Sequence, residues 1–286
     1  MGLASAYLEL TKPRLSALVL ATTAIGFWMG MRQVGHGTRF VVTLLGTVLV
    51  VGGANALNEW MERDADGLMQ RTRHRPLPAK QLTPDAACRF GIVLIVGGVL
   101  LLAVAVNLLS AALAVCAAVS YLCVYTPLKP RTSLCTLVGA VPGAIPPLIG
   151  WAAARGALGP EAWALFALLF LWQLPHFLAI AVLYRDDYVR AGFKMLSVTA
   201  PDGAAAARQT VLYAMALLPA SLFPTLLGLS GSVYFHGALC LGLGFALLAV
   251  RSALTRSLQT ARQLFIASVL YLPLLMALLG FDKVAG

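Results

Sequence analysis

The residues best suited to chemistry lie between Asn58 and Pro76. The chain has only 11 acidic residues, and four of them fall close together in this stretch: Glu59, Glu62, Asp64 and Asp66. Asn58, Glu62 and Asp66 recur at every fourth position, so a helix would place their oxygen-bearing side chains on one stripe. Hard divalent cations such as Mg2+ prefer oxygen ligands and keep waters that a phosphate can replace. The spacing therefore predicts a magnesium site that binds a diphosphate.

The other charged residues of this stretch receive different predictions. Glu59 and Asp64 fall off the stripe, and Asp64 is expected to be a solvated charge. Arg71 and Arg75 lie four residues apart, and the forked donors of a guanidinium suit phosphate oxygens. Pro76 is expected to end the helix, because the residue before a proline is pushed out of the α region. The alternative interpretation is an ordinary charged loop between two membrane helices.

The composition is that of a polytopic membrane protein. The chain is 60% hydrophobic and 11% charged, and its mean hydropathy is +0.85. Nine apolar segments have the length of about twenty residues that a helix needs to cross a bilayer, and none alternates as a barrel strand would. They are residues 15–33, 38–58, 90–108, 110–127, 134–153, 162–184, 210–229, 234–250 and 264–281. We therefore predict an all-α fold, a nine-helix transmembrane bundle, with residues 1–286 forming a single domain.

The net charge of +10 reports topology and gives no indication of nucleic-acid binding. Most of the 21 Lys and Arg residues fall on one side of the predicted bundle, the side of the N-terminus. By the positive-inside rule this side is cytoplasmic, and nine crossings place the C-terminus outside. The inner loops at about 59–89 and 185–208 are expected to carry the site. The five scattered cysteines are expected to be small apolar residues.

Two further membrane segments carry unusual residues. Segment 134–153 contains three prolines and several glycines, so it must kink, and its small residues let a helix or a flat ligand come close. A distorted packing helix without a ligand is an equally good interpretation of this segment alone. Segment 162–184 contains Gln173 and His176 one turn apart, and polar residues within a span mark a site by default. A single buried histidine is more often structural, but a neighbouring glutamine, a proline and two downstream carboxylates favour function here.

A second acidic pair, Asp186 and Asp187, follows segment 162–184 on the same inner side as the first cluster. The two acidic clusters lie four helices apart, which suggests a pseudo-repeat with the acidic loops facing each other. The cationic residues on this side are candidate diphosphate ligands, although plain topology signals would look the same. These residues are Lys129, Arg131 and Lys194. Lys12 and Arg14 are expected to anchor the first helix at lipid headgroups.

Several blocks resemble the UbiA superfamily of intramembrane prenyltransferases, and within it the haem O synthases. The first aspartate-rich motif of the superfamily, N-x-x-x-D-x-x-x-D, resembles Asn58-x-x-x-Glu62-x-x-x-Asp66, with glutamate in the middle. The blocks typical of the haem-directed branch are Tyr125-Thr126-x-Leu128-Lys129, Gly143-Ala144-x-Pro146-Pro147-x-x-Gly150-Trp151 and Trp172-Gln173-x-Pro175-His176-Phe177. The match runs from Thr11 to Leu196 and weakens in the last three helices. The second aspartate-rich motif is thinner, since His176 stands where relatives carry the first aspartate.

The resemblance implies farnesyl transfer from farnesyl diphosphate to a vinyl group of haem B, with addition of water, to give haem O. It implies that Asn58, Glu62 and Asp66 hold Mg2+, while cations neutralise the leaving diphosphate. The implied cations are Arg71, Arg75, Lys129, Arg131 and Lys194. It also implies a flat haem and prenyl pocket lined by Trp151, Trp172, Gln173 and Phe177. His176 would be either an iron ligand or a hydrogen-bonding group near the acceptor.

Two rival functions have distinct expectations. The nearest is the same fold acting on an aromatic, quinone-precursor acceptor, against which the Trp172-Gln173-x-Pro175-His176 block argues. The other is a transporter, which would place its substrate site near the bilayer midplane. The resemblance further implies a bacterial inner-membrane protein, embedded in the lipid bilayer, that passes its product to a haem A synthase or a terminal oxidase assembly.

Overall fold

The computed structural model describes residues 2–32 and 37–284, and within these ranges the chain is helical apart from turns and one isolated bridge between Ser230 and Lys283. The helices are α1 (Leu3–Leu10), α2 (Pro13–Gly30), α3 (Gly37–Leu68), α4 (Pro84–Ala105), α5 (Leu108–Val119), η1 (Ser120–Tyr125), α6 (Thr126–Leu128), α7 (Cys135–Ala144), α8 (Pro146–Arg155), α9 (Pro160–Leu183), α10 (Arg185–Arg190), α11 (Leu196–Thr199), α12 (Ala204–Leu226), α13 (Ser232–Thr255) and α14 (Leu258–Phe281). The predicted all-α class is confirmed.

Eight helical stretches of the described chain are long and apolar enough to cross a membrane, one fewer than predicted. The predicted segment that is not among the eight is the first, which corresponds to α2. It has only 18 residues and begins with Pro13 and Arg14, so its polar start is part of the helix itself. It nevertheless lies lengthwise in the bundle, packed against α3 and α8.

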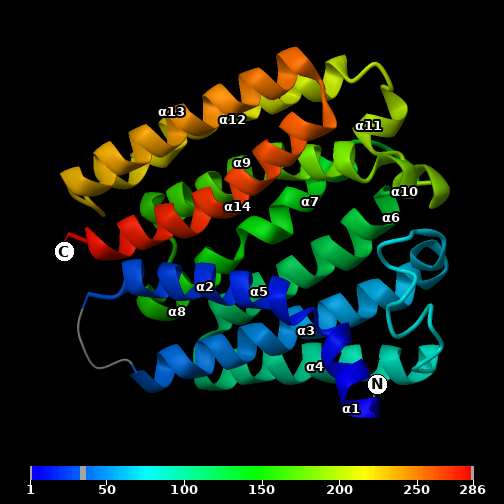
Figure 1. Cartoon of the computed structure of the whole chain (residues 1–286). Coiled ribbons are helices and arrows are strands. Elements are labelled where there is room, and N and C mark those ends of the chain that lie inside the picture. Colours follow the sequence, from blue (N-terminus) through cyan, green and yellow to red (C-terminus); the bar gives the residue numbers. More distant parts are fainter. Residues whose placement is uncertain (1, 33–36, 285–286) are drawn as a thin grey trace.

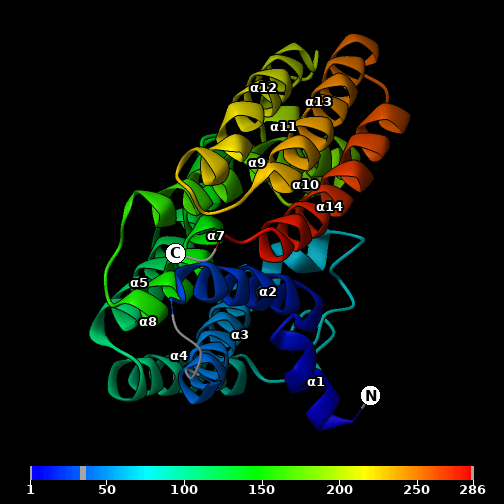
Figure 2. The ribbon, with the colours of Figure 1, turned by 90° about the vertical axis from the view of Figure 1, so that its left-hand side faces the viewer.

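The long helices run side by side (Figure 1). Helices α3 and α4 form one edge of the bundle and α12 and α13 the opposite edge, with α2 and α14 between them (Figures 1 and 2). One large cluster of buried apolar side chains joins α9, α12, α13 and α14, and a second joins α4, α5 and α8. The start of α1 and the end of α14 lie at opposite ends of the bundle (Figure 1).

Helix α3 continues past the apolar segment, as predicted, and reaches Leu68. It ends eight residues before Pro76, so the prediction that this proline ends the helix is wrong. The Thr72 hydroxyl donates to the backbone carbonyl of Asp66 at 2.9 Å, which satisfies a group that the helix end leaves free. Residues 69–83 then fold into turns before Thr83 caps α4 by accepting from the N–H of Ala86.

The proline-rich segment is broken, as its sequence predicts. Helix α7 ends at Ala144 and α8 starts at Pro146, so the span consists of two short helices. Helix α8 lies against α2 at glycine contacts, because a Cβ on Gly150 would overlap the carbonyl oxygen of Thr23, and one on Gly26 would overlap that of Pro147. This close approach holds α2 in place and positions its first residues beside α3.

Candidate functional site

The acidic stripe of α3 is buried. Asn58, Glu62 and Asp66 are 2%, 8% and 1% exposed, so the three residues are sheltered although they follow the apolar part of the helix. Asp64 is a solvated charge, as predicted, with a side chain 93% exposed. Glu59 is 1% exposed and lies within the same cluster, contrary to its predicted place off the stripe. The reason is helical periodicity, since residues 59, 62 and 66 are three and four apart and share a face.

Each carboxylate of this cluster is held by a cation from elsewhere in the chain. Lys129 reaches both oxygens of Glu62, at 2.6 Å and 2.8 Å. Arg75 donates to Asp66 Oδ2 at 2.8 Å and lies 3.5 Å from Glu59 Oε1. The loop that follows α3 thus folds back on the helix it leaves, and the segment after η1 covers the same stripe.

Lys12 is the unexpected member of the cluster. Its Nζ donates to Asn58 Oδ1 at 3.1 Å and lies 3.7 Å from Glu59 Oε1, so its expected role as a headgroup anchor is wrong. The amide of Asn58 in turn donates to Thr126 Oγ1 at 3.1 Å. Lys12 has a backbone φ of +49°, a left-handed conformation that costs a non-glycine residue about 1 kcal/mol. Such strain at a buried cationic contact indicates a functional position.

Mutual interaction of these charges shifts their pKa values. Burial, followed by the field of Arg75, lowers the pKa of Lys12 to about 8, against the opposing effect of Glu59. Burial also lowers the pKa of Arg75 and of Lys129, but their carboxylate partners more than offset this and leave both pKa values raised. Lys12 is therefore the cation of the cluster that can lose its proton at mildly alkaline pH.

The donor atoms of the cluster suit a hard cation, but in the described residues no three His, Cys, Asp or Glu side chains stand ready as a metal site. The predicted set contains an amide, and its carboxylates are engaged in ion pairs. Two carboxylate oxygens, Glu59 Oε2 and Asp66 Oδ1, are nevertheless buried without a hydrogen-bond partner. Unpartnered buried oxygens are costly, which is the situation that a bound cation relieves. Mg2+ needs only one or two carboxylates, since waters and phosphates complete its shell.

An apolar cavity of about 250 Å³ lies inside the bundle, and its lining residues are uncharged and do not include those of the acidic cluster. One face of α3 joins the two, because its wall residues Thr47, Val51 and Asn55 lie on the same helical stripe as Asn58 and Glu62. Tyr121 and Tyr125 line the cavity as well, and Lys129 Nζ lies 4.7 Å from the Tyr125 ring centroid. The cavity itself is thus apolar, and helix α3 and Tyr125 connect its wall to the charged cluster.

The predicted pocket residues divide between this cavity and the core. Gln173 and Phe177 line the cavity. Trp151 and Trp172 do not, and both are buried in the core shared by α8, α9 and α14, where the Trp172 indole donates to the carbonyl of Ser268 at 2.9 Å. The sequence could not show which of the four residues line the cavity, because each lies on an apolar helix with no polar face to indicate which side points inward.

His176 is turned toward α14. Its ring stacks on Trp172 and on Phe265, with centroids 5.3 Å and 5.1 Å apart. Nδ1 lies 2.7 Å from the Ser268 hydroxyl oxygen, whose single proton is donated to the carbonyl of Phe265 at 2.6 Å. Nδ1 must therefore carry the proton, and the Nε2 lone pair is left free.

The second acidic pair has a different structure. Asp186 is exposed, whereas Asp187 is buried and accepts from the backbone N–H of Gln70 at 2.8 Å and from Arg190. Burial raises the pKa of Asp187, but these donors more than offset this and leave its pKa lowered. Asp187 thereby ties α10 to the loop that follows α3.

Three of the predicted diphosphate cations lie outside the buried cluster. Arg71 stacks over the rings of Tyr184 and Tyr188, with centroid distances of 4.9 Å and 4.8 Å. Arg131 and Lys194 are exposed. Of the five, only Arg75 and Lys129 contact the acidic stripe in the described structure.

Sequence reasoning missed Lys12, Glu59, Tyr121 and Ser268. The three-and-four spacing of residues 59, 62 and 66 was a usable signal for Glu59. No local pattern marks Lys12 or Ser268, because each meets its partner across 46 and 92 residues of chain respectively.

The model of the UbiA prenyltransferase family matches residues 19–277. Among curated proteins, the chain is similar to Protoheme IX farnesyltransferase of Solibacter usitatus (strain Ellin6076), with 49% identity over 97% of this chain and 98% of that protein. It is also similar to the proteins of the same name from Koribacter versatilis (strain Ellin345), 45% identical over 97% and 93%, and from Myxococcus xanthus (strain DK1622), 45% identical over 98% and 95%.

Solved structures share the fold at low identity. A digeranylgeranylglyceryl phosphate synthase superposes with a TM-score of 0.83 at 15% identity, covering 99% of both chains. A UbiA homolog from Archaeoglobus fulgidus bound to GPP and Mg2+ gives a TM-score of 0.69 at 18% identity, over 96% of this chain and 99% of that one. The chain belongs to the UbiA prenyltransferase family and, within it, to the protoheme IX farnesyltransferases.

Proposed function

We propose that this chain transfers the farnesyl group of farnesyl diphosphate to a vinyl group of haem B, with addition of water, to give haem O. The whole of residues 1–286 acts as one domain. Relatives at 41–49% identity carry the name of this reaction. The observation that carries the proposal is the shared face of α3, which lines an apolar cavity with one half and bears the buried acidic stripe on the other. An isoprenoid diphosphate has the same division into an apolar tail and a charged head.

The acidic stripe holds the diphosphate end. Asn58, Glu62 and Asp66 are the residues that would hold Mg2+, and the unpartnered Asp66 Oδ1 supports this assignment. When bound, Mg2+ would add positive charge to the diphosphate and so help the allylic C–O bond to break. Lys129 and Arg75, which pair with Glu62 and Asp66 in the described structure, are the cations placed to bind the phosphate oxygens. Lys12 is placed to contribute a third cation.

The cavity holds the farnesyl chain and shields the reacting carbon from water. As the C–O bond breaks, its electron pair leaves with the diphosphate and an allylic cation remains. The stacked rings of Tyr121 and Tyr125, with centroids 5.6 Å apart, line the cavity close to Lys129 and offer π faces to this cation. The haem vinyl carbon then attacks, and water adds to the new cation beside the porphyrin and loses a proton.

His176 binds the haem iron in this proposal. Its Nε2 lone pair is free because Nδ1 donates to Ser268, and a neutral imidazole held in this way is a common metal ligand. Gln173 and Phe177, which line the cavity, are neighbours of His176 on α9, although the His176 ring itself is turned toward α14 and does not line the cavity. Ser268→Ala is expected to weaken haem B binding about tenfold and alter its absorption spectrum, while Ser268→Thr restores both. An unchanged spectrum in Ser268→Ala would remove His176 as an oriented ligand.

The experiment that tests the function is acceptor selection. Purified protein in lipid nanodiscs is given farnesyl diphosphate, Mg2+ and either haem B or 4-hydroxybenzoate, and products are identified by mass spectrometry. We expect haem O from the first mixture and no prenylated acid from the second. A prenylated aromatic acid would support the rival with an aromatic acceptor. The position of the stripe, beyond the apolar part of α3, favours an enzyme over a transporter with a midplane site.

The same proposal implies a cellular location and partner proteins. The chain lies in a bacterial inner membrane with its N-terminus and the acidic cluster on the cytoplasmic side, as the distribution of Lys and Arg predicts. Haem O leaves the site as a lipid-soluble product. The partners expected to receive it are a haem A synthase or a terminal oxidase assembly.

A further inference from the structure

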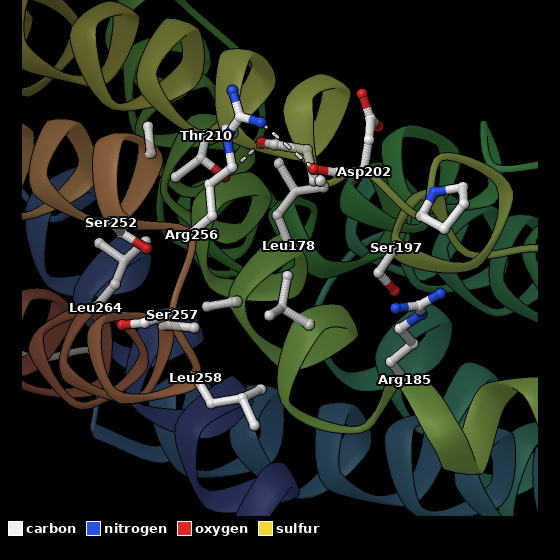
Figure 3. A pocket seen from close by; sticks show the side chains of 18 residues that line it. Leu178, Arg185, Ser197, Asp202, Thr210, Ser252, Arg256, Ser257, Leu258 and Leu264 are labelled. Atoms are coloured by element: carbon white, nitrogen blue, oxygen red, sulfur yellow. Dashed lines mark hydrogen bonds between the residues drawn. The ribbon is translucent and has the colours of Figure 1, made fainter.

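A second pocket lies at the end of the bundle that carries α10, and no residue of α3 lines it. It has a volume of about 220 Å³ and opens between the end of α9, the start of α12 and the turn from α13 to α14 (Figure 3). None of the residues that line it belongs to the acidic stripe or to the apolar cavity described above. The proposed reaction therefore leaves this pocket without a role.

Two arginines line the pocket, and neither forms an ion pair in the described part of the chain. Arg185 comes from the start of α10 and Arg256 from the turn between α13 and α14 (Figure 3). The one carboxylate of the lining, Asp202, accepts from the backbone N–H of Ala204 at 3.3 Å instead of pairing with an arginine. Arg256 reaches only the Asp202 backbone carbonyl, at 3.4 Å. Two guanidiniums from separate elements thus share one hollow without an anionic side chain bound to either.

The backbone at Arg256 is strained. Its φ of +48° is left-handed, at the position after α13 where glycine is the usual residue. An arginine there costs about 1 kcal/mol relative to glycine. A strained residue at a pocket is a reason to look for what its side chain binds.

The rest of the lining is amphipathic. The apolar side chains of Leu178, Leu258 and Leu264 line the pocket together with the hydroxyls of Ser252 and Ser257 (Figure 3). Helices α9, α12, α13 and α14 are all long and apolar enough to cross a membrane, and the pocket lies at their ends. A ligand that fits such a lining has a phosphate for the guanidiniums and hydrocarbon for the leucines.

We infer that this pocket binds the headgroup of an anionic glycerophospholipid from the adjoining leaflet. The forked donors of Arg185 and Arg256 bind the phosphate oxygens, and the glycerol end of the acyl chains lies against the leucines. Basic pockets between membrane helices are a general means of binding such headgroups. Because Arg185 begins α10, whose Asp187 holds the loop after α3, bound lipid also stabilises that end of the molecule.

The test is lipid retention by the purified full-length protein. Detergent-solubilised protein is mixed with phosphatidylglycerol, phosphatidylcholine or inorganic phosphate, and bound species are counted by native mass spectrometry. The double variant Arg185→Gln/Arg256→Gln is compared with Arg251→Gln/Arg262→Gln, which removes the same charge from exposed arginines near the same turn that do not line the pocket. We expect wild type and the control variant to retain phosphatidylglycerol at least about tenfold better than the pocket variant.

The other outcomes contradict the inference. Equal loss of phosphatidylglycerol in both double variants would mean that overall charge, and no particular pocket, holds the lipid. Equal retention by wild type and pocket variant would show that the arginines do not bind it. Displacement of the lipid by millimolar inorganic phosphate would identify a site for free phosphate instead. Thermal unfolding without added lipid confirms that both variants are folded, and added phosphatidylglycerol is expected to raise the melting temperature of the control variant only.

Discussion

The two acidic clusters look alike in the sequence and differ in the structure. Each follows an apolar helix at the same end of the bundle, and each contains carboxylates close to arginines. The stripe of α3 is buried, lies beside a cavity and keeps two carboxylate oxygens without partners. In the pair that starts α10, Asp186 is exposed and Asp187 has its oxygen bonded to Gln70 and Arg190.

This difference suits the first cluster to ligand binding and the second to holding two segments of the chain together. Donors from the chain itself already occupy Oδ1 of Asp187, whereas a carboxylate with a buried oxygen that lacks a partner gains by binding a ligand. The two acidic loops of the predicted pseudo-repeat are thus unequal in structure. The first cluster has the features expected of the proposed binding site, and Asp187 of the second holds α10 to the loop that follows α3.

The largest effect is expected at Asp66. Asp66→Asn removes a charge from the stripe, loses the ion pair with Arg75 and should lower farnesyl transfer about 10³-fold. Binding of Mg2+ with pyrophosphate, measured by calorimetry, should fall with it. Asp64→Asn is the matched control, since this exposed carboxylate lies two residues away and its loss should leave turnover unchanged. Full activity in Asp66→Asn would end the assignment of the stripe as the diphosphate site.

Lys129 comes next. Lys129→Met leaves Glu62 without its partner and removes a cation from the proposed phosphate site, so pyrophosphate affinity should fall about 10-fold to 100-fold. The double variant Lys129→Met/Glu62→Gln removes the unpaired charge, and it should recover thermal stability without recovering affinity. Lys80→Met, at an exposed lysine of the loop before α4, controls for the change in total charge. Recovery of affinity in the double variant would mean that Lys129 only neutralises Glu62.

Asp187 should affect stability more than binding. Asp187→Asn weakens the contacts with Gln70 and Arg190 and should cost about 1–3 kcal/mol in the free energy of unfolding. The lowered pKa of Asp187 means that its stabilisation is present above about pH 4 and is lost as the pH falls through the lowered pKa. Thermal unfolding of Asp187→Asn and of the exposed control Asp186→Asn measures the difference. Loss of Mg2+ binding in Asp187→Asn with unchanged stability would restore the second cluster as a metal site.

Local patterns predicted much of the fold. The apolar segments, the extension of α3 beyond residue 58 and the break in the segment with Pro142 and Pro146 all follow from interactions within a few residues. The first predicted span does not meet the length and hydropathy expected of a membrane helix, because α2 has only 18 residues and two of them are Pro13 and Arg14. Such features are readable because their causes, periodicity and proline geometry, are local.

Only the part of the candidate site that lies on a single helix was predicted from the sequence. The stripe of α3 follows from the period of the helix, but its partners come from residues 12, 75 and 129. Which cations meet which carboxylates depends on how α2 and the segment after η1 pack against α3. These long-range contacts leave no local pattern in the sequence, which is why Lys12 is expected there to be a surface anchor and is instead found in the buried cluster.

The smallest effect, and the one that most sharpens the contrast between the clusters, concerns pH. The pKa of Lys12 is lowered to about 8, because burial and the charge of Arg75 outweigh the attraction of Glu59. Lys129 lowers this pKa further and Glu62 raises it.

As pH rises through about 8 the free protein loses the charge of Lys12, so pyrophosphate affinity should fall by up to about tenfold between pH 7 and pH 9. Lys12→Arg keeps its charge over this range, so comparison of the two proteins cancels the titration of the ligand itself. The pKa of Asp187 is lowered, so this carboxylate stays charged over the same range and Asp187→Asn should retain the wild-type pH profile. If Lys12→Arg showed the same decline as wild type, the charge of Lys12 would play no part in binding the diphosphate.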